Sequence, residues 1–426
     1  MSHSYCIRTS LDLKDENIHF EEDFCKEIKI KGKRSKMYYG KLTYTPIRCA
    51  NCGTEKEGHS IIKYGFKTSR ITLNSVSHFP TYLSLKKQRF FCKYCQTTFI
   101  AESKEVDRYC YISNLVKQSI AIESKDKISE KDLAKRHHVS PTTTSRVIKA
   151  LGRQFKLNYQ YLPNHLSFDE FQSVARKMSF TYINSKSHQL IDVLPDRRLD
   201  TLRSHFLNYS YQTRNKVKTI VIDMNTPYMT LIKELFGNAD IIVDPFHLVQ
   251  LVSRSLNQTR IKLMNQYRTS NPEDLKKYRK LKRYWRLILK AETKLSATHY
   301  SYHRLFKGMK SQKGVVDYLL SLGEEFRITY EFYQRLLYAF DKKDYNYFVH
   351  CLNTAPDGLS SYMNTSLKTL KKYQKYVKNT FIYPYTNGPI EGINNKIKVI
   401  KRIAFGFRNF SKIKTRILIS CNTIQK

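Results

Sequence analysis

Two apolar runs in the middle of the chain each end in an aspartate. Residues 218–223 (KTIVID) and 240–244 (DIIVD) have the composition of buried strands. Between them, residues 226–237 carry apolar positions at helical spacing. A strand, a helix and a second strand in this order predict parallel strands joined by a right-handed crossover. Ligands of open α/β sheets gather at the carboxyl ends of the strands, which is where this pattern puts Asp223 and Asp244.

A third acid follows an apolar stretch earlier in the chain, where residues 165–171 read HLSFDEF. Side chains alternate along a strand, so only one of Asp169 and Glu170 can face the same site as the other two aspartates. Further on, residues 178–194 predict a hairpin, and a helix follows at about 199–207. An acid after a strand is also a common helix N-cap, so each aspartate alone has an ordinary structural explanation.

Near the C-terminus, residues 387–402 (NGPIEGINNKIKVIKR) have the pattern of an amphipathic helix. Isoleucines recur at helical spacing as a buried stripe, and the opposite face carries Glu391, Asn395, Lys398 and Arg402. An ordinary solvated basic helix with an acid in its first turn would look the same. Together with the three aspartates, however, the glutamate points to a carboxylate cluster for divalent metal.

Four cysteines in the N-terminal third form two CxxC pairs, Cys49 with Cys52 and Cys92 with Cys95. Thiolates at this spacing on a tight turn can occupy two vertices of a zinc tetrahedron, and a second such turn completes it. The gap between the pairs is longer than usual for a ribbon, but residues 69–86 have the pattern of strands that could span it. We therefore predict one structural Zn²⁺, with unliganded cysteines as the alternative.

Residues 111–155 predict a helix-turn-helix DNA-binding domain. Ser129 begins one helix with a capping pattern, and Ser140 begins the next, with a proline at its first position. His138 stands in the turn where glycine is usual, so an unrelated helical hairpin is the alternative. The first turns of the second helix would face a DNA groove: Thr142, Thr143, Thr144, Ser145 and Arg146.

The composition constrains the partner. The chain has 426 residues, enough for two to four domains, and 75 basic against 36 acidic residues give a formal net charge of +39. Basic residues are spread along the chain, which predicts an extended surface for a polyanion. The 31 tyrosines interleave with basic residues and could stack on bases, although an AT-rich genome would enrich the same residues. No long apolar run and no signal-like start are seen, so we expect a soluble intracellular protein without membrane contact.

Several of these features resemble the DDE transposases of bacterial insertion sequences, in particular the family known as ISL-three. They are the acids Asp169, Asp223 and Glu391 in this order, the Asp244-x-x-His247 step, and residues 387–410. The resemblance implies a ribonuclease-H-like catalytic core, two Mg²⁺ ions (or Mn²⁺) and cleavage and transfer of strands of double-stranded DNA. The DNA would be the inverted repeats of a mobile element and its target. A homodimer or higher oligomer on DNA is also implied, in the bacterial cytoplasm and associated with the nucleoid.

Pattern and resemblance together predict a multidomain α/β protein. We expect an N-terminal segment of unclear role, a zinc ribbon-like module, the helix-turn-helix domain, a ribonuclease-H-like core in two parts and an all-α insertion. Their bounds are 1–45, 46–105, 111–155, 165–247 with 381–426, and 248–380, respectively.

We assign Asp169, Asp223 and Glu391 as the catalytic triad, because carboxylates are natural ligands of the two hard cations that assist phosphodiester cleavage. Asp244 competes with Asp223, since both end strands. We prefer Asp223 because Asp244 and His247 match a separate motif of the family. His247 would contact the scissile phosphate or steady the site; alternatively it is a histidine at a helix start that Asp244 satisfies. Three residues of the C-terminal helix would contact DNA: Asn395, Lys398 and Arg402.

Two other functions would use the same features. A regulator derived from a transposase would bind DNA and keep the carboxylates as relics, although the presence of all the motif acids argues against it. A nuclease or resolvase on the same fold would cut without preference for the ends of an element and without joining. Metal-dependent cleavage of DNA that contains the ends separates the first alternative from a transposase, and joining separates the second.

Overall fold

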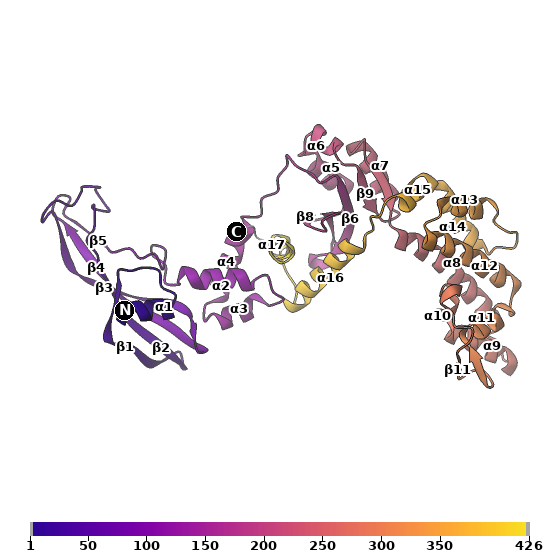
Figure 1. The fold of residues 1–426 in the computed structure, drawn as a ribbon, viewed down its shortest axis with the longest axis horizontal. Coiled ribbons are helices and arrows are strands. Elements are labelled where there is room, and N and C mark those ends of the chain that lie inside the picture. Colours follow the sequence, from indigo (N-terminus) through magenta and orange to yellow (C-terminus); the bar gives the residue numbers. More distant parts are fainter. Residues whose placement is uncertain (1–2, 423–426) are drawn as a thin grey trace. The chain divides into compact units, whose positions relative to one another are not determined.

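The computed structural model describes residues 3–422, which divide into two compact units (Figure 1). One unit consists of the chain up to Lys156 together with the segment from Lys396 onward, and the other consists of Leu157–Asn395. Helix α16 (Gly388–Ile403) contributes residues to both. The core segment that we predicted as 381–426 is therefore divided between the two units after residue 395.

A five-stranded mixed sheet forms the centre of the second unit, with the strand order β10-β9-β6-β7-β8. β6 pairs in parallel with β9, and β9 pairs in parallel with β10, whereas β6, β7 and β8 form antiparallel pairs. The parallel strands and the hairpin expected from the sequence are both present. The strands are β6 (His165–Gln172), β7 (Met178–Asn184), β8 (Leu190–Leu194), β9 (Thr219–Ile222) and β10 (Asp240–Val243), and the 3₁₀ turn η1 (Val174–Arg176) joins the first two.

Three helices complete this α/β part: α5 (Leu199–Leu207), α6 (Tyr211–Asn215) and α7 (Thr226–Leu235). Asn225 caps α7, because its side chain accepts a hydrogen bond from the N–H of Tyr228. Buried aromatic rings of the strands and helices pack together, and the centroids of Phe168, Phe180 and Phe206 lie 5.1 to 6.3 Å apart. This packing holds α5 against β6 and β7.

From β10 onward the second unit is almost entirely helical, as expected, except for a short hairpin of β11 (Tyr300–Tyr302) and β12 (Met309–Ser311). The last of these helices, α15, returns to the sheet beside β10. There the side chains of Asn379 and Thr380 donate hydrogen bonds to the carbonyl oxygens of Ile241 and Val243, at 2.8 and 2.6 Å. The elements are α8 (Pro245–Gln266), α9 (Pro272–Arg283), α10 (Trp285–Ile288), η2 (Glu292–Lys294), α11 (Gln312–Leu320), α12 (Glu324–Lys342), α13 (Tyr345–Asn353), α14 (Ser361–Lys372) and α15 (Gln374–Ile382).

The first unit begins with a second five-stranded sheet, ordered β1-β2-β4-β3, with β5 paired to β4. Residues up to 45, whose role the sequence pattern left unclear, supply two of these strands and a helix. Ile7 of that helix, Ile18 of β1 and Leu83 of β4 are buried in one core. The N-terminal segment and the zinc-binding module therefore share a sheet and a core. The elements are α1 (His3–Ser10), β1 (Ile18–Ile30), β2 (Lys33–Leu42), β3 (Ile61–Val76), β4 (Phe79–Cys92) and β5 (Thr97–Ile100).

Four helices form the rest of this unit: α2 (Asn114–Glu123), α3 (Glu130–Arg136), α4 (Pro141–Gly152) and α17 (Phe410–Cys421). Ser129 and Ser140 cap α3 and α4 as the sequence predicted. α17 packs beside α4, so that two segments far apart in the sequence lie together (Figure 1). The buried Arg416 of α17 donates hydrogen bonds to the carbonyl oxygens of Ser124 and Ile128, at 2.6 and 2.8 Å. These contacts explain why the end of the chain belongs to the first unit.

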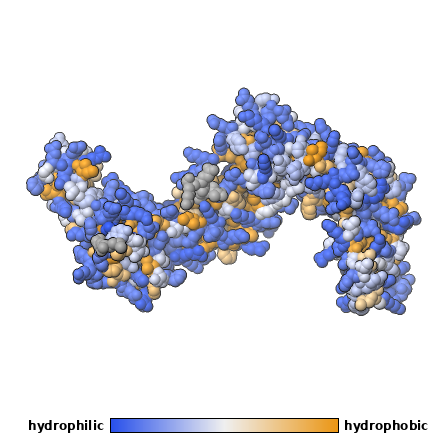
Figure 2. Space-filling view, in the orientation of Figure 1, coloured by the Kyte–Doolittle hydropathy of each residue, from blue (hydrophilic) through white to orange (hydrophobic). Residues whose placement is uncertain are grey.

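In the view of Figure 2, hydrophilic residues cover most of the surface and hydrophobic residues form small scattered groups. No helix within residues 3–422 combines the length and the apolar character needed to cross a lipid bilayer. Charged and polar side chains thus dominate the surface that this view presents.

Candidate active site and zinc site

Three aspartates occupy one level of the central sheet in the second unit. The parallel register pairs Ser167 of β6 with Val221 of β9, so Asp169 and Asp223 fall at the same level two residues further on. The register of β10 against β9 likewise puts Asp244 level with Asp223. The three acids therefore come from adjacent strands. Asp223 and Asp244 lie just past the carboxyl ends of β9 and β10, and Asp169 lies beside them within β6. This is the edge at which open α/β sheets bind their ligands.

The side chain of His247, in the first turn of α8, contacts Asp223 rather than Asp244. Its Nε2 lies 2.9 Å from Oδ1 of Asp223, whereas only the backbone N–H of His247 reaches the Asp244 carbonyl oxygen. The hydrogen bond that His247 donates to Asp223 raises the pKa of His247, and the charges of Asp244 and Glu391 act in the same direction. The expectation that Asp244 satisfies this histidine is wrong for the side chain.

Helix α16 holds the aspartates through an asparagine at its start. Asn387 is buried, and its side-chain N–H₂ donates to Oδ1 of Asp223 at 3.2 Å and to the carbonyl oxygen of Phe168 at 3.3 Å. Its backbone N–H donates to Oδ1 of Asp244 at 2.8 Å. One residue thus connects all three strands that carry the acids.

A second asparagine, about two turns further along the chain in α16, holds the remaining acid. The buried side chain of Asn394 donates to Oδ2 of Asp169 at 2.7 Å and to the carbonyl oxygen of Glu170 at 3.3 Å. Its neighbour Asn395, which the sequence analysis selected, is exposed. The signal for Asn394 was its position in the isoleucine stripe, four residues after Ile390, where a polar side chain must find a buried partner.

Asp169 is the most perturbed acid of the group. Burial above all, together with the charges of Asp223 and Glu391, raises its pKa to about 6, against the lowering effect of hydrogen bonds from the Glu170 N–H and from Asn394. Burial also raises the pKa of Asp244. Repulsion among carboxylates in a partly buried site is what a bound divalent cation would relieve. Within residues 3–422, however, the triad acids are not drawn into a group whose oxygens all lie within 4.8 Å of one another.

Glu170 is engaged elsewhere. Its carboxylate accepts a hydrogen bond from the Tyr228 hydroxyl at 2.5 Å and pairs with Arg197 at 2.5 Å. Asp169 and Glu170 therefore have separate sets of partners, as strand alternation requires.

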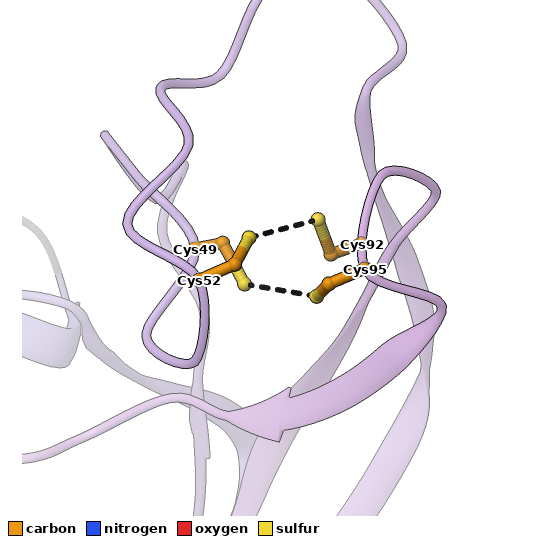
Figure 3. A group of neighbouring side chains, drawn as sticks. All are labelled: Cys49, Cys52, Cys92 and Cys95. Carbon is orange, nitrogen blue, oxygen red and sulfur yellow. Dashed lines mark hydrogen bonds between the residues drawn. The ribbon is translucent and has the colours of Figure 1, made fainter.

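The four cysteines of the first unit form a second, compact site. Cys49 and Cys52 stand on one turn and Cys92 and Cys95 on another, and the sulfurs of the two pairs point toward each other (Figure 3). The Sγ atoms of Cys49 and Cys95 are 3.8 Å apart, and those of Cys52 and Cys92 are 3.9 Å apart. A tetrahedron with Zn–S bonds of about 2.3 Å has edges of about 3.8 Å. The cysteines therefore fit Zn²⁺, as predicted.

Comparison with known families identifies the chain. The family model described as Transposase, which represents the ISL3 group of DDE transposases, matches residues 166–417. The chain belongs to this family. A second model, described as the zinc-finger of the transposases IS204, IS1001, IS1096 and IS1165, matches residues 45–95 and includes all four cysteines of the ISL3 chain. The resemblance seen in the sequence is confirmed.

Two known proteins are similar in sequence to parts of this ISL3 chain, and their names describe different activities. The transposase for insertion sequence element IS1001 of Bordetella parapertussis is 27% identical over 247 residues, which are 58% of this chain and 58% of that protein. A Lactococcus lactis subsp. lactis protein named ATP-dependent protease is 39% identical over 112 residues, which are 26% of this chain and 35% of that protein. The chain thus spans less than two thirds of either relative. The activity in the second name rests on about a quarter of this chain and is not carried over.

The DNA-facing residues expected on α4 of the ISL3 chain need correction. Thr143 and Thr144 are buried, so they pack inside the helical group and cannot face a groove. Thr142 and Arg146 are exposed, and Ser145 is partly exposed. His138 has a φ of 53°, the left-handed conformation that makes glycine usual at this turn. His138 thus takes up this conformation without being a glycine.

Lys398 and Arg402 are exposed in α16, on the part of the helix that belongs to the first unit. Their spacing from the exposed Glu391 is the one that the sequence pattern indicated.

Proposed function

We propose that the chain is a transposase that binds the terminal inverted repeats of an insertion sequence and catalyses metal-dependent cleavage and transfer of DNA strands. The observation that carries this proposal is the level row of Asp169, Asp223 and Asp244, fixed to α16 by Asn387 and Asn394. Family membership supports the same reading.

Asp169, Asp223 and Glu391 would hold two Mg²⁺ ions (or Mn²⁺). Their oxygen donors suit hard cations, and the buried amide oxygens of Asn387 and Asn394 have no hydrogen-bond partner among residues 3–422, so acceptors for metal-bound water are at hand. When bound, such ions activate the attacking water or hydroxyl and stabilise the leaving oxygen. Asp244 is the runner-up to Asp223 as the second acid.

The protein's own groups have separate tasks in this proposal. Asn387 and Asn394 orient the carboxylates, because each donates to an oxygen that would otherwise be free to turn. His247 is held by Asp223, and its raised pKa favours the charged form, which can donate to a phosphate oxygen of the DNA.

The remaining parts would bind DNA. We infer a helix-turn-helix in α3 and α4, with Thr142, Ser145 and Arg146 reading base edges. Phosphate contacts would come from Asn395, Lys398 and Arg402 and from the basic helices of residues 248–380, in a homodimer or higher oligomer on double-stranded DNA. We further infer a ribonuclease-H-like core, since the sheet order and pairing described above are those expected of it.

The test uses purified chain, Mg²⁺ and linear DNA that carries the repeats flanking the gene. Asp169→Asn, Asp223→Asn and Glu391→Gln should each abolish cleavage and joining while binding of the same DNA persists, because the basic surfaces are unchanged. Asp200→Asn, an acid of α5 that is 95% exposed, is the matched control and should leave cleavage intact.

Each failure has its own meaning. Binding without cleavage by the unaltered chain would favour the regulator, and cleavage without end preference or joining would favour the nuclease. Activity that survives Asp223→Asn but not Asp244→Asn would reverse the assignment of the second acid.

A further inference from the structure

The two faces of the N-terminal sheet have opposite character. Alternate residues of β3 and β4, such as Ile71, Leu83 and Leu85, are completely buried in the core. Their neighbours along the strands point to the other side. On that side, for most of its length, the side chains are exposed or half-buried, so the sheet presents a second face that its own core does not use.

The register puts basic and aromatic residues in rows on this second face. β2 and β4 pair Tyr39 with Ser84 and Lys41 with Lys86, and β4 and β3 continue these rows to Arg70 and Thr68. Tyr82 of β4 and Phe66 of β3 lie in the rows on either side, where they pair with Thr72 and Gln88. We call these residues the basic sheet face: Tyr39, Lys41, Phe66, Thr68, Arg70, Tyr82, Ser84 and Lys86. None of the eight is an acid, and the acids of the adjoining β1 bulge, Glu21, Glu22 and Asp23, lie at its edge opposite Tyr39.

The charges on the basic sheet face are not neutralised within the protein. Lys41 and Lys86 are direct cross-strand neighbours, an arrangement that destabilises a sheet. Lys41 lies over the ring of Phe66 at 4.8 Å, and Arg70 lies over that of Tyr82 at 5.6 Å. None of these three cations forms an ion pair with a carboxylate of residues 3–422. A polyanion would compensate a cluster that folding alone does not require.

The basic sheet face continues toward the helix that we propose reads DNA. Tyr82 also lines a hollow of about 400 Å³ between the sheet and α3, whose wall reaches Ser140 and Pro141 at the start of α4. Four lysines line the same hollow: Lys31, Lys33, Lys131 and Lys135. Lysines therefore lie along the hollow that leads from Tyr82 to the first turn of α4.

We propose that the basic sheet face binds the phosphate backbone of the double-stranded DNA that α4 reads, and so lengthens the DNA site beyond the helices. Lys41, Arg70 and Lys86 contact phosphates, and the exposed rings of Tyr39 and Phe66 pack against the sugar-phosphate chain. DNA is the occupant because the eight residues include three cations and no acid, and because Tyr82 also lines the hollow that reaches the start of α4. This inference rests on the proposed function, since it needs a chain that binds DNA.

The experiment measures how the affinity of the full chain for a random-sequence DNA duplex depends on salt. The triple variant Lys41→Gln, Arg70→Gln and Lys86→Gln removes three phosphate contacts, each of which adds about 0.9 to the logarithmic salt slope. Between about 50 and 200 mM salt, the factor by which the variant loses affinity should therefore be about 40-fold smaller than the factor for the unaltered chain. The matched control has the same net charge and changes three exposed residues outside the face: Lys14→Gln, Lys104→Gln and Arg108→Gln.

A charge-conserving triple (Lys41→Arg, Arg70→Lys and Lys86→Arg) should keep the original slope, and zinc content shows that each variant is folded. An unchanged slope in the glutamine triple, or an equal loss in the control, would overturn the proposal for this face. Either result would leave the proposed function standing, because cleavage of repeat-containing DNA is measured separately. A chain that binds no duplex at all would overturn both.

Discussion

The cysteine site and the carboxylate site are both built for metal, yet the protein prepares them in opposite ways. The four sulfurs already lie at tetrahedral separations, on turns that each supply two ligands. The three triad acids come from separate strands and a distant helix, and their oxygens stay further apart. Thiols are neutral when protonated and can approach one another, whereas ionised carboxylates repel. The first site therefore contributes to folding, and the second stores a repulsion that a bound cation or a proton removes.

The largest effect should follow from breaking the cysteine site. Cys52→Ser or Cys95→Ser should lower zinc from about one ion per chain to none and disorder the turns that carry the ligands. The sheet has its own core around Ile18 and Leu83, so it should persist. Metal analysis and hydrogen exchange check this. Cys351→Ser, a buried cysteine of α13 outside the site, is the control for zinc content. Full zinc occupancy in Cys52→Ser would contradict the assignment.

The corresponding test of the carboxylate site changes a residue that holds an acid in place and leaves the acids themselves unchanged. Asn394→Ala removes the donor that lies 2.7 Å from Asp169 and should lower the cleavage rate about 10- to 100-fold, as losses next to metal ligands do. That hydrogen bond lowers the pKa of Asp169, so without it the acid limb of the pH–rate profile should move to higher pH. DNA binding should be unchanged. Asn208→Ala, at an exposed asparagine just after α5, is the control. An unshifted profile with a reduced rate would mean that Asn394 only supports the fold.

Removing a ligand should also affect stability in opposite directions at the two sites. Loss of a cysteine should destabilise its turns, whereas loss of the Asp169 charge should stabilise the fold. The pKa of Asp169 is about 6 in the folded chain against an ordinary value of 3.8, so its ionised form destabilises the fold above pH 6. Without divalent cations, Asp169→Asn should therefore raise the free energy of unfolding at pH 8, by at most about 3 kcal/mol, since one pKa unit is about 1.4 kcal/mol. The gain should vanish as the pH falls through 6 toward 4. Denaturant titrations at both pH values measure it, and a loss of stability at pH 8 would contradict the stored repulsion.

The same contrast explains what could be predicted from the sequence. Local patterns sufficed for the parallel strands that end before Asp223 and Asp244, for the caps Ser129 and Ser140, and for the CxxC pairs. Contacts between distant segments did not leave such patterns. Asn394 meets Asp169 across more than two hundred residues, so only its place in the apolar stripe pointed to it.

Two other features were hidden for physical reasons. β1 (IHFEEDFCKEIKI) has exposed and half-buried residues along most of its length, and pairing with β2 rather than its own alternation brings it into the sheet. Thr144 looked like a groove-facing residue because threonine is polar, but its small side chain also fits a closely packed helix contact. The end of the chain joined the first unit through Arg416, whose carbonyl partners no sequence pattern marks.

The smallest effect should come from a neighbour of the cysteines. The Thr97 hydroxyl lies 3.0 Å from Sγ of Cys95, and this hydrogen bond lowers the pKa of Cys95, as the donors around Asp169 do for that acid. Thr97→Val keeps the shape of the side chain and removes the donor. Because Cys95 is partly exposed, water can replace the lost hydrogen bond, so zinc affinity should fall less than about tenfold, the lower limit for such partners. Competition with a chromophoric chelator measures the affinity, and Thr98→Val is the control. A loss as large as that of Cys95→Ser would show that the cysteine turns are not preorganised, and the contrast with the carboxylates would fail.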